Sequence, residues 1–326
     1  MSLRSSLLGL GLALVTWCSA QTYTNPVYPQ DFPDPFVLND DGTYYAFSTN
    51  VGSVHIPTLR SSTLASWTWL GDALPELPVW SEEVGDLVWA PGVLERDDGY
   101  VLYYTTRHRA SGRQCISRAT ALGPEGPYID KSAKPFVCQV QLGGSIDPYP
   151  FVDTDGQAYL YWKNDGNCCD LSVGLWVQRL SRDGQRLEGR PQELIQRNQL
   201  WELPLIENPA MWAQEGRYYL LYSANWWESY AYSVGYAVCE SATGPCRKPL
   251  ERPIFKAAGS VMGPGGEAFF VDSQDQLWLS YHAWTAPYTT YPKGARTLRI
   301  DRIRFEEGKP EIEEPTETPQ PLRSKP

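Results

Sequence analysis

Three carboxylic acids stand one or two residues before a proline in widely separated parts of this 326-residue chain: Asp34, Asp147 and Glu207. Carboxyl groups can divide acid–base work between them, one donating a proton and another withdrawing one from water. That chemistry requires the side chains to meet in space, although about 170 residues separate the first from the last. The chain must therefore contain elements that bring distant segments together.

A five-fold repeat supplies such elements. Each copy is a tight-turn phrase followed by aromatic and aliphatic residues, at residues 40–45, 97–103, 155–161, 215–220 and 275–279. Successive copies begin 57 or 60 residues apart when the turn positions are compared. Asp-Gly and related pairs favour two-residue hairpin turns, and the residues that follow favour strands. A repeat of this length indicates the blades of a propeller.

A short apolar strand precedes each turn, and we expect it to be the innermost strand of its blade, beside the central channel. Counting back 8 to 10 residues from each turn gives one residue per repeat at the start of this strand: Asp34, Trp89, Asp147, Glu207 and Glu267. These five residues would meet at one mouth of the channel. The repeat therefore predicts a single site made by several blades.

The predicted fold class is all-β, a five-bladed β-propeller with four-stranded antiparallel blades around a central channel. The chain is 42% hydrophobic and contains 13 Trp and 20 Tyr, and no stretch keeps a helical period of 3.6. We expect residues 21–306 to form one domain. The acidic, proline-rich residues 307–326 are typical of a disordered tail, with no second folded domain.

The first 20 residues predict a secretory signal peptide, with Arg4, an apolar run from Leu7 to Val15, and cleavage after Ala20. A lipoprotein acylated at Cys18 is disfavoured because Trp17 is bulky. The expected location is secreted and extracellular. Loss of Arg4 takes the formal charge from −10 to −11, which argues against nucleic-acid and anionic-membrane partners.

Six cysteines remain after removal of the leader, an even number suited to an oxidising compartment. Cys239 and Cys246 flank a turn and form the best-supported pair, and Cys115 with Cys138 would close a loop within the second repeat. The neighbours Cys168 and Cys169 are left, either as a vicinal disulfide or as two free thiols. Paired Cys-x-x-Cys or His-rich spacings, which would indicate a metal site, are absent from the sequence.

An ordered set of motifs resembles family 43 of the glycoside hydrolases over about residues 22–306. The motifs are Asn25-Pro26-Val27, Asp31 to Phe36, Trp89-Ala90-Pro91, Ser145 to Pro148 and Glu207-Asn208-Pro209. The resemblance implies a five-bladed propeller that hydrolyses glycosidic bonds with inversion, usually in arabinan, arabinoxylan or related hemicellulose.

The same resemblance implies roles for the carboxylates. Asp34 would be the general base that activates water, Glu207 the general acid, and Asp147 the neighbour that raises the acid's pKa and orients it. Inversion needs base and acid on opposite faces of the sugar, roughly 6.5 to 9.5 Å apart. Two alternatives stay open: Asp31 or Asp147 could simply be a turn residue. Asn208 departs from the glycine or alanine usual after the acid.

Further positions resemble family sites that surround the sugar. Trp89 would stack on the sugar, unless it is an ordinary core tryptophan. Arg296 would reach a sugar hydroxyl, and His282 would lie in the channel, where it could support a metal or be a structural histidine. Glu267 would form a channel hydrogen bond or sit in a loop. Some relatives hold calcium or water there, but the sequence shows no cluster of oxygen ligands, so we expect no required cofactor, with a structural Ca²⁺ in the channel left open.

Two loops after second strands, residues 164–170 and 225–230, could shape a pocket. We expect Asn164 and Trp226 in these loops to contact substrate, although a loop packed on its own blade would look similar.

The resulting prediction is a secreted α-L-arabinofuranosidase, exo-acting and monomeric, that releases L-arabinose from plant cell-wall polysaccharide or oligosaccharide. The run Lys163 to Cys169 resembles arabinose-releasing members of the family. A β-xylosidase or endo-arabinanase is the nearest alternative, since the same three carboxylates serve all of them. A non-catalytic sugar-binding propeller should lack one carboxylate, and a retaining fructoside-processing propeller needs the two acids only about 5 to 5.5 Å apart.

Overall fold

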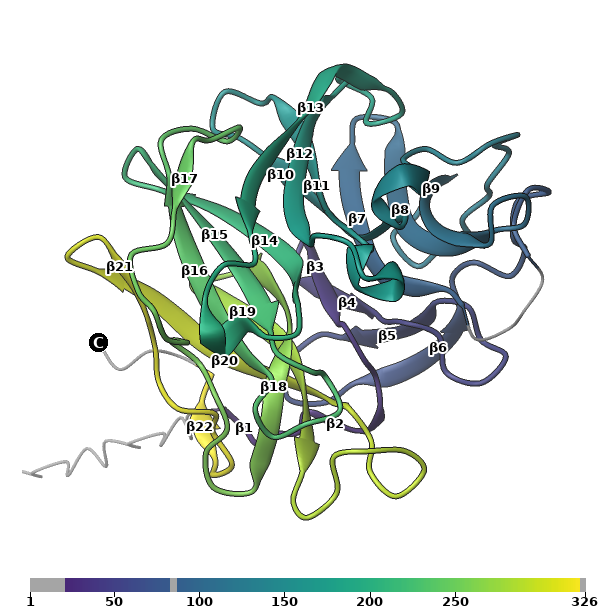
Figure 1. Ribbon diagram of the computed structural model, residues 1–326. Coiled ribbons are helices and arrows are strands. Elements are labelled where there is room, and N and C mark those ends of the chain that lie inside the picture. Colours follow the sequence, from purple (N-terminus) through teal and green to yellow (C-terminus); the bar gives the residue numbers. More distant parts are fainter. Residues whose placement is uncertain (1–20, 83–86, 323–326) are drawn as a thin grey trace, which may run out of the picture.

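The computed structural model describes residues 21–82 and 87–322, and its sheets radiate from a common centre as five blades (Figure 1). The sequence prediction of a five-bladed, all-β propeller is therefore confirmed. The predicted signal peptide, residues 1–20, lies outside the described residues. Helix is confined to three short 3-10 turns among the described residues: η1 (Val140–Leu142), η2 (Gly166–Cys169) and η3 (Leu200–Glu202).

Each blade is an antiparallel sheet whose strands follow in chain order from the inside outwards. The first blade consists of β3 (Phe36–Asp40), β4 (Thr43–Phe47), β5 (Pro57–Ser61) and β6 (Thr68–Asp72). The second consists of β7 (Trp89–Arg96), β8 (Gly99–His108) and β9 (Arg113–Ala121). The third consists of β10 (Ser145–Val152), β11 (Ala158–Asn164), β12 (Gly174–Leu180) and β13 (Leu187–Gln196). The fourth consists of β14 (Ile206–Gln214), β15 (Arg217–Ala224), β16 (Ser233–Cys239) and β17 (Cys246–Arg247).

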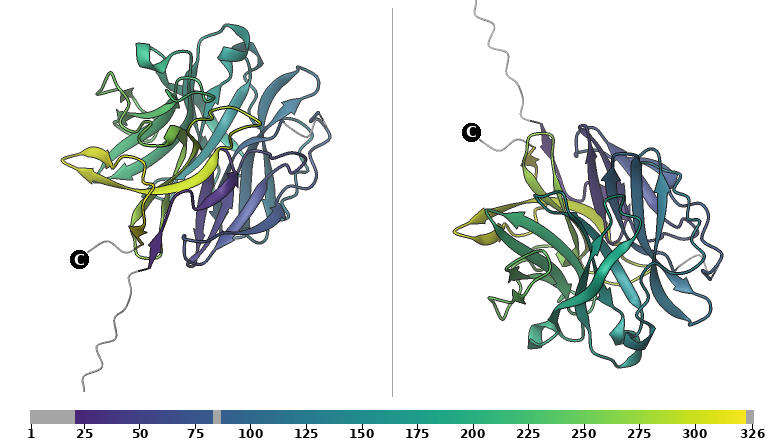
Figure 2. Two further views of the ribbon diagram at one scale, coloured as in Figure 1. Left: turned by 90° about the horizontal axis from the view of Figure 1, so that it is seen from below. Right: turned by 90° about the horizontal axis from the view of Figure 1, so that it is seen from above.

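The fifth blade closes the ring with strands from both ends of the chain. It consists of β18 (Val261–Val271), β19 (Leu277–Thr285), β20 (Thr297–Glu306) and the early strand β2 (Tyr28–Asp31). Tyr28 pairs with Leu298 and Asp31 with Thr297, so the chain start is locked against the last blade. β1 (Thr22–Tyr23) also pairs with β22 (Gln320–Pro321), which places the two ends of the described chain side by side (Figure 2).

The hairpin turns of the first and fourth blades have the geometry that the repeat predicted. Asp41 and Gly42 have φ values of 47° and 85°, and Glu215 and Gly216 have 51° and 74°. Positive φ at both central residues matches the right-handed twist of the flanking strands and explains the recurrence of glycine. The short turns hold each inner strand against the next strand of its own blade.

Among the described residues, the second blade has no continuous fourth strand. Its outer edge, β9, makes isolated bridges from Thr120 to Ile129 and from Ile116 to Val137. The segment between Ile129 and Val137 contains Pro135, which lacks the N–H that a ladder needs. The disulfide between Cys115 and Cys138 fastens this segment to the blade.

The prediction of a disordered tail was wrong for residues 307–322. A turn at Glu307-Gly308 leads into β21 (Lys309–Ile312), which pairs with β20. Further on, the Thr316 hydroxyl donates to Asp301 at 2.6 Å, and Leu322 is buried. The polar composition concealed these contacts because each apolar residue of the segment is isolated among charges.

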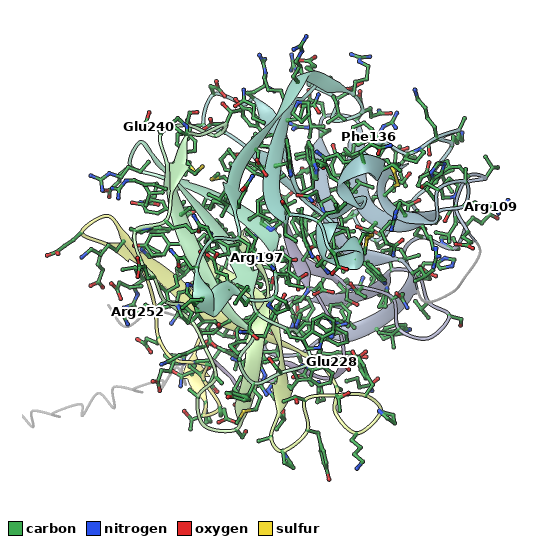
Figure 3. All side chains as sticks on the ribbon, viewed as in Figure 1. Arg109, Phe136, Arg197, Glu228, Glu240 and Arg252 are labelled. Atoms are coloured by element: carbon green, nitrogen blue, oxygen red, sulfur yellow. A yellow bond between two sulfur atoms is a disulfide. The ribbon has the colours of Figure 1, made fainter. Side chains whose placement is uncertain are left out.

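All three predicted disulfides, Cys115–Cys138, Cys168–Cys169 and Cys239–Cys246, form in the structure. Charged side chains such as Arg109, Glu240 and Arg252 project from the periphery of the ring (Figure 3). Within the described residues, the helical turns are too short and too polar to cross a membrane.

Candidate active site

In the second to fifth blades a register break lies within the inner strand, and these breaks shape the site. The residue just before the break is paired with the second strand: Trp89 with Thr105, Ile146 with Lys163, Glu207 with Ser223, and Gly265 with His282. In the first blade, the Thr49 N–H donates to Pro33 O just ahead of β3. The next residue has positive φ in every blade: Asp34, Ala90, Asp147, Asn208 and Gly266. Bulges of this kind redirect side chains at the edges of sheets.

This alignment corrects the sequence-based one. Counting back from the turns placed Asp34, Trp89, Asp147, Glu207 and Glu267 in one equivalent position, but they occupy three successive positions. Asp34 and Asp147 have positive φ, Trp89 and Glu207 come one residue earlier, and Glu267 comes one residue later. The turns differ in length between blades, so a count from the glycine cannot locate the bulge.

The bulges open into a pocket of about 630 Å³ at one end of the propeller. It brings together six of the eight predicted site residues: Asp34, Trp89, Asp147, Glu207, Trp226 and Arg296. A pocket of this size is typical of small-molecule sites. The three carboxylates come from the first, third and fourth blades.

Asp34 is surrounded by groups that favour its ionised form. The Thr49 hydroxyl donates to Oδ2 at 2.6 Å, and an Arg296 guanidinium nitrogen lies 3.6 Å from the same oxygen. Burial alone would raise the pKa of Asp34, but the Arg296 guanidinium and the Thr49 hydroxyl hold it well below its usual value. Asp34 is therefore a carboxylate able to accept a proton.

Arg296 is fixed from several sides. Its guanidinium stacks over the Trp227 ring at 4.5 Å from the centroid, and its Nε donates to the Tyr291 hydroxyl at 3.2 Å. Asp31 accepts from both the Tyr291 hydroxyl, at 2.7 Å, and the Arg296 backbone N–H, at 2.8 Å. Asp31 thus anchors the arginine that faces Asp34.

Glu207 is held by a buried cation and a phenol. Lys163, whose side chain is 1% exposed, donates to Oε2 at 3.0 Å, and the Tyr232 hydroxyl donates to Oε1 at 2.8 Å. Burial alone would lower the pKa of Lys163, but Glu207, Asp165 and Asp147 keep it above its usual value. Lys163 is therefore an ammonium ion in the wall of the pocket.

Asp147 lies in the opposite electrostatic situation from Asp34. Burial and the neighbouring Glu207 raise the pKa of Asp147 well above its usual value, against the opposing effect of Lys163. Its Oδ2 accepts the Asn208 backbone N–H at 3.0 Å, which ties it to the residue after Glu207. We refer to these two neighbouring acids as the Asp147–Glu207 pair. Burial also raises the pKa of Asp165, which faces Lys163, to about 6.

His282 and Glu267 lie beneath the pocket on the channel side. His282 is fully buried, and its Nδ1 accepts the Asp34 backbone N–H at 3.0 Å. Since burial lowers its pKa, the ring is neutral and carries its proton on Nε2. Burial raises the pKa of Glu267 to about 8, and the Ser223 hydroxyl donates to its Oε2 at 2.5 Å.

Two polar atoms in the channel are left over. Among the described residues, His282 Nε2 and Glu267 Oε1 are buried without a hydrogen-bond partner. The remaining channel wall combines prolines and apolar side chains such as Phe36 and Ala268 with the polar residues Asp34, Asp147 and Asn208. A structural Ca²⁺ in the channel, an ion that takes six to eight oxygen ligands, stays a prediction.

Of the two loop residues predicted to contact substrate, one lines the pocket and the other does not. Trp226 lines the pocket and is 43% exposed, so its ring is open to a ligand. Asn164 is not part of the pocket wall. Its buried amide instead binds Leu142 O, Ser172 O and the Gly174 N–H, and so it holds the loop on its own blade.

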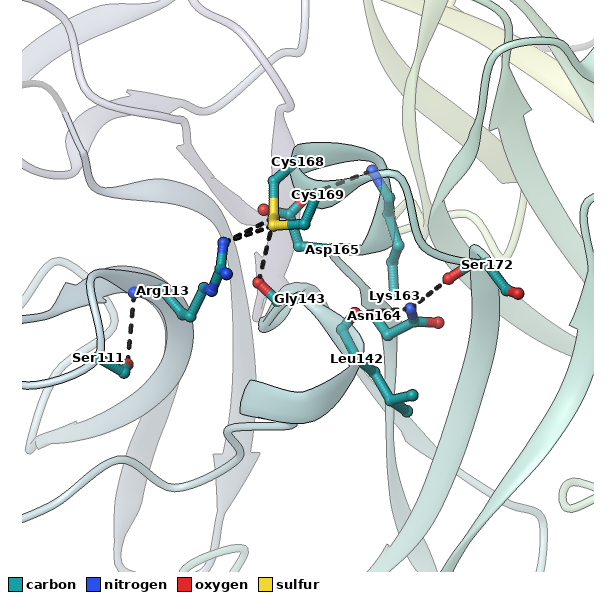
Figure 4. Close-up of a disulfide and its surroundings, with 10 residues drawn as sticks. All are labelled: Ser111, Arg113, Leu142, Gly143, Lys163, Asn164, Asp165, Cys168, Cys169 and Ser172. Atoms are coloured by element: carbon teal, nitrogen blue, oxygen red, sulfur yellow. Dashed lines mark hydrogen bonds and ion pairs between the residues drawn. A yellow bond between two sulfur atoms is a disulfide. The ribbon is translucent and has the colours of Figure 1, made fainter.

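The vicinal disulfide stands at the rim on the side of the third blade. Cys168 lines the pocket, while Arg113 from the second blade donates to the sulfurs of both cysteines (Figure 4). Lys163 and Asp165 lie directly beside it in the same view. The 3-10 turn η2, which carries the disulfide, therefore forms a braced edge of the pocket.

Sequence reasoning assigned no role to three groups that contact the carboxylates of the pocket: Lys163, Tyr232 and Thr49. Lys163 occurs in an apolar strand, Tyr161-Trp162-Lys163, and a lysine there is a signal of a buried charge. Tyr232 and Thr49 carry no comparable signal, because hydroxyl side chains are common at strand ends.

Comparison with known proteins agrees with this geometry. The model of glycosyl hydrolases family 43 matches residues 23–310. The crystal structure of a thermostable family-43 glycoside hydrolase superposes with a TM-score of 0.82 and 32% identity, over 93% of this chain and 100% of that one. β-D-galactofuranosidase xynD of Aspergillus niger is 24% identical over 307 residues, 90% of this chain and 85% of that protein. The xylosidase/arabinosidase of Butyrivibrio fibrisolvens is 28% identical over 206 residues, 61% of this chain but only 38% of that protein. The chain therefore belongs to glycosyl hydrolase family 43 and is a hydrolase of O-glycosyl bonds.

Proposed function

We propose that this protein is an exo-acting, inverting α-L-arabinofuranosidase. One observation carries the proposal: a single pocket holds a carboxylate kept ionised, Asp34, and a carboxyl whose protonated form is favoured, Asp147, beside Glu207. Environments that drive the ionisation of neighbouring carboxyls apart mark the base and the acid of such a site.

The proposed reaction uses each group once. Asp34 withdraws a proton from a water molecule as the oxygen of that water bonds to the anomeric carbon. The bond from that carbon to the glycosidic oxygen breaks, and Glu207 gives its proton to the departing oxygen. Asp147 shares the proton with Glu207 before the step and orients the acid through Asn208. Water attacks the face opposite the leaving group, so the anomeric configuration inverts.

Substrate preference is argued from the pocket wall. Trp89 and Trp226 present aromatic surface, and Arg296 presents a cationic donor beside Asp34. The wall also includes Tyr291 and Cys168, on opposite blades. A wall built from several blades favours a terminal sugar over the middle of a chain, which supports exo action on arabinan or arabinoxylan.

A second candidate is furanoside hydrolysis with a hexose in place of the pentose. It is favoured by the relative described as a β-D-galactofuranosidase, which matches 90% of this chain. The relative described as a xylosidase/arabinosidase favours the β-xylosidase alternative. All these activities would use the same three carboxylates.

The test is hydrolysis of nitrophenyl α-L-arabinofuranoside, β-D-xyloside and β-D-galactofuranoside, together with linear arabinan. The proposal expects the arabinofuranoside to have the highest kcat/KM and arabinan to release only monosaccharide. Early release of longer oligosaccharides would favour an endo-arabinanase. Failure to cleave any of the four, or full activity in Glu207→Gln, would refute the proposed function.

Secretion as a monomer is part of the same proposal. The three disulfides support secretion, because such bonds persist in oxidising compartments. Mass spectrometry of the exported protein, with Gln21 as its first residue, would test the predicted cleavage.

A further inference from the structure

One position breaks a hydrogen-bonding rule that the other blades obey. In four blades, a side chain at the end of the second strand, opposite the start of the bulge, accepts a hydrogen bond from the next blade. The donor is the backbone N–H of the positive-φ residue in that blade's bulge. Thr49 accepts from Ala90 at 2.8 Å, Thr105 from Asp147 at 3.3 Å, Ser223 from Gly266 at 2.9 Å, and His282 from Asp34 at 3.0 Å. These contacts link each blade to its neighbour around the ring.

The equivalent residue of the third blade is Lys163, which pairs with Ile146. An ammonium group has donors only and cannot accept an N–H. The Asn208 N–H, which this position should receive, instead donates to Asp147 Oδ2 at 3.0 Å. The ammonium turns to Glu207 Oε2, also at 3.0 Å. The lysine at this position thus changes the contacts of both acids: Asp147 accepts the Asn208 N–H, and Glu207 pairs with the ammonium.

We infer that Lys163 is a positioning residue that serves as the counter-ion of the Asp147–Glu207 pair and sets the pH at which this pair gives up its proton. The inference deepens the proposed function and rests on it where it assigns the acid role to Glu207. A buried ammonium stabilises the carboxylate left on Glu207 after proton transfer, when that charge is newly formed. It also makes Asp147 available to Asn208, which fixes the geometry of the pair.

Other charged and titratable groups also face this pair. Asp165 lies 4.0 Å from Lys163 Nζ, and Tyr232 donates to Glu207 from the start of the fourth blade's third strand. Glu267 and Asp34 lie near enough on the channel side to interact electrostatically with the pair. Apart from Tyr232, these neighbours are carboxyls. Arg296 offsets the charge of Asp34, and Arg113 lowers the pKa of Asp165. Lys163 is the cation that directly contacts Glu207.

The experiment compares Lys163→Thr and Lys163→Met with the wild-type chain. Lys163→Thr restores the hydroxyl that the first and second blades use, so an acceptor for the Asn208 N–H is again present. Lys163→Met keeps the length of the side chain without its charge. Thr105→Ser is the matched control, because it changes the same position of the second blade but keeps the acceptor.

Two readouts are needed. The first is the pH dependence of kcat/KM on nitrophenyl α-L-arabinofuranoside. The second is a carbon-13 NMR titration of labelled Asp and Glu carboxyls, assigned with Asp147→Asn and Glu207→Gln, which requires no activity. Loss of an opposite charge within about 4 Å raises the pKa of a carboxyl by roughly one to three units. We expect both lysine variants to move the alkaline limb, and the titration of the pair, upward by at least about one unit, with Thr105→Ser unchanged.

The outcomes separate the two proposals. If the pair titrates at the same pH in wild type and in the folded lysine variants, the inference about Lys163 is overturned. If wild type cleaves none of the glycosides, the proposed function falls, and the NMR titration alone still decides whether Lys163 controls the pair. If Lys163→Thr does not fold, Lys163→Met provides the same comparison.

Discussion

Asp34 and Arg296 form the most exposed charge pair of the pocket, and they provide a test at the scale of single residues. Arg296 is the largest of the influences that lower the pKa of Asp34. The base works only when ionised, so raising its pKa moves the acidic limb of kcat/KM to higher pH. We expect Arg296→Gln to shift that limb upward by about one unit or more.

The control for this change is Arg302→Gln. Arg302 also stacks its guanidinium on a tryptophan, Trp278, at 4.6 Å, but it is absent from the pocket wall. An equal shift in both variants would show that loss of a stacked arginine, rather than loss of the charge beside Asp34, changes the profile.

Glu267 makes a residue-scale prediction about stability. Burial raises its pKa to about 8, from an ordinary value of 4.5. Between these two pH values the unfolded chain is ionised at this residue while the folded chain is not, so folding loses free energy as pH rises. Below pH 4.5 this penalty is absent. Glu267→Gln removes the ionisation and keeps an acceptor for Ser223.

We therefore expect the unfolding free energy of wild type to fall between pH 4.5 and 8 relative to that of Glu267→Gln. The difference should reach at least about 1 kcal/mol, since one unit of pKa shift corresponds to about 1.4 kcal/mol. Urea unfolding at both pH values measures it. Parallel pH dependence in the two proteins would contradict the assigned ionisation.

At the scale of elements, the bulge at the start of each inner strand is the device that aims the catalytic groups. Gly266 shows how tightly the fifth blade is built: its φ is +62°, and a Cβ there would collide with the His282 ring and lie 2.8 Å from Asp34 Oδ1. Gly156, in a hairpin turn, has φ of +83° but open space around it. Both glycines have a left-handed backbone conformation, but only Gly266 is crowded by neighbouring side chains.

Gly156→Ala should cost about 1–2 kcal/mol of stability, because the position is left-handed, and Gly266→Ala should cost more, because its Cβ also collides with His282. Only Gly266→Ala should also lower kcat, by about tenfold or more, because it displaces the base from its position. Urea unfolding and kinetics on the two variants provide the comparison. Equal kcat values would mean that Asp34 is not held in place by this bulge.

At the scale of the whole molecule, the C-terminal segment is a clasp on the fifth blade. Thr316 donates twice to the buried Asp301, which also receives the Tyr281 hydroxyl at 2.6 Å. Deleting residues 307–326 removes these contacts and the β21 pairing. We expect a stability loss of at least about 1–3 kcal/mol, because two hydrogen bonds to a buried carboxyl are lost.

The urea midpoint of the truncated chain, compared with that of Glu314→Ala on the exposed face of the same segment, measures this loss. Because the clasp lies away from the pocket, kcat of the truncated chain should be unchanged at a temperature where it stays folded. A midpoint equal to that of the full chain would restore the original expectation of a disordered tail.

The sequence predicted the propeller and the meeting of three carboxylates in one pocket because their signals are local. Turn glycines report hairpins, and a proline after Asp34 or Asp147 reports the start of an inner strand. The equivalence of positions between blades could not be predicted, since it depends on where each bulge breaks the register. Asn164 was misplaced for a similar reason: a polar loop residue reads alike whether its amide faces solvent or, as here, three backbone groups of its own blade.

The roles of Lys163 and Arg296 lie between these cases. Each depends on a charge from one blade reaching a carboxylate of another, at 3.0 Å and 3.6 Å, and no single-strand pattern contains that distance. The ring architecture makes such contacts possible by bringing five strand ends to one place.

The most direct test of the account is the anomeric configuration of the first sugar released. Proton NMR during hydrolysis of nitrophenyl α-L-arabinofuranoside should show β-L-arabinofuranose before mutarotation mixes the anomers, because water activated by Asp34 attacks opposite the leaving group that Glu207 protonates. Initial appearance of the α-anomer would show retention through a covalent intermediate and would contradict the assignment of Asp34 as a base.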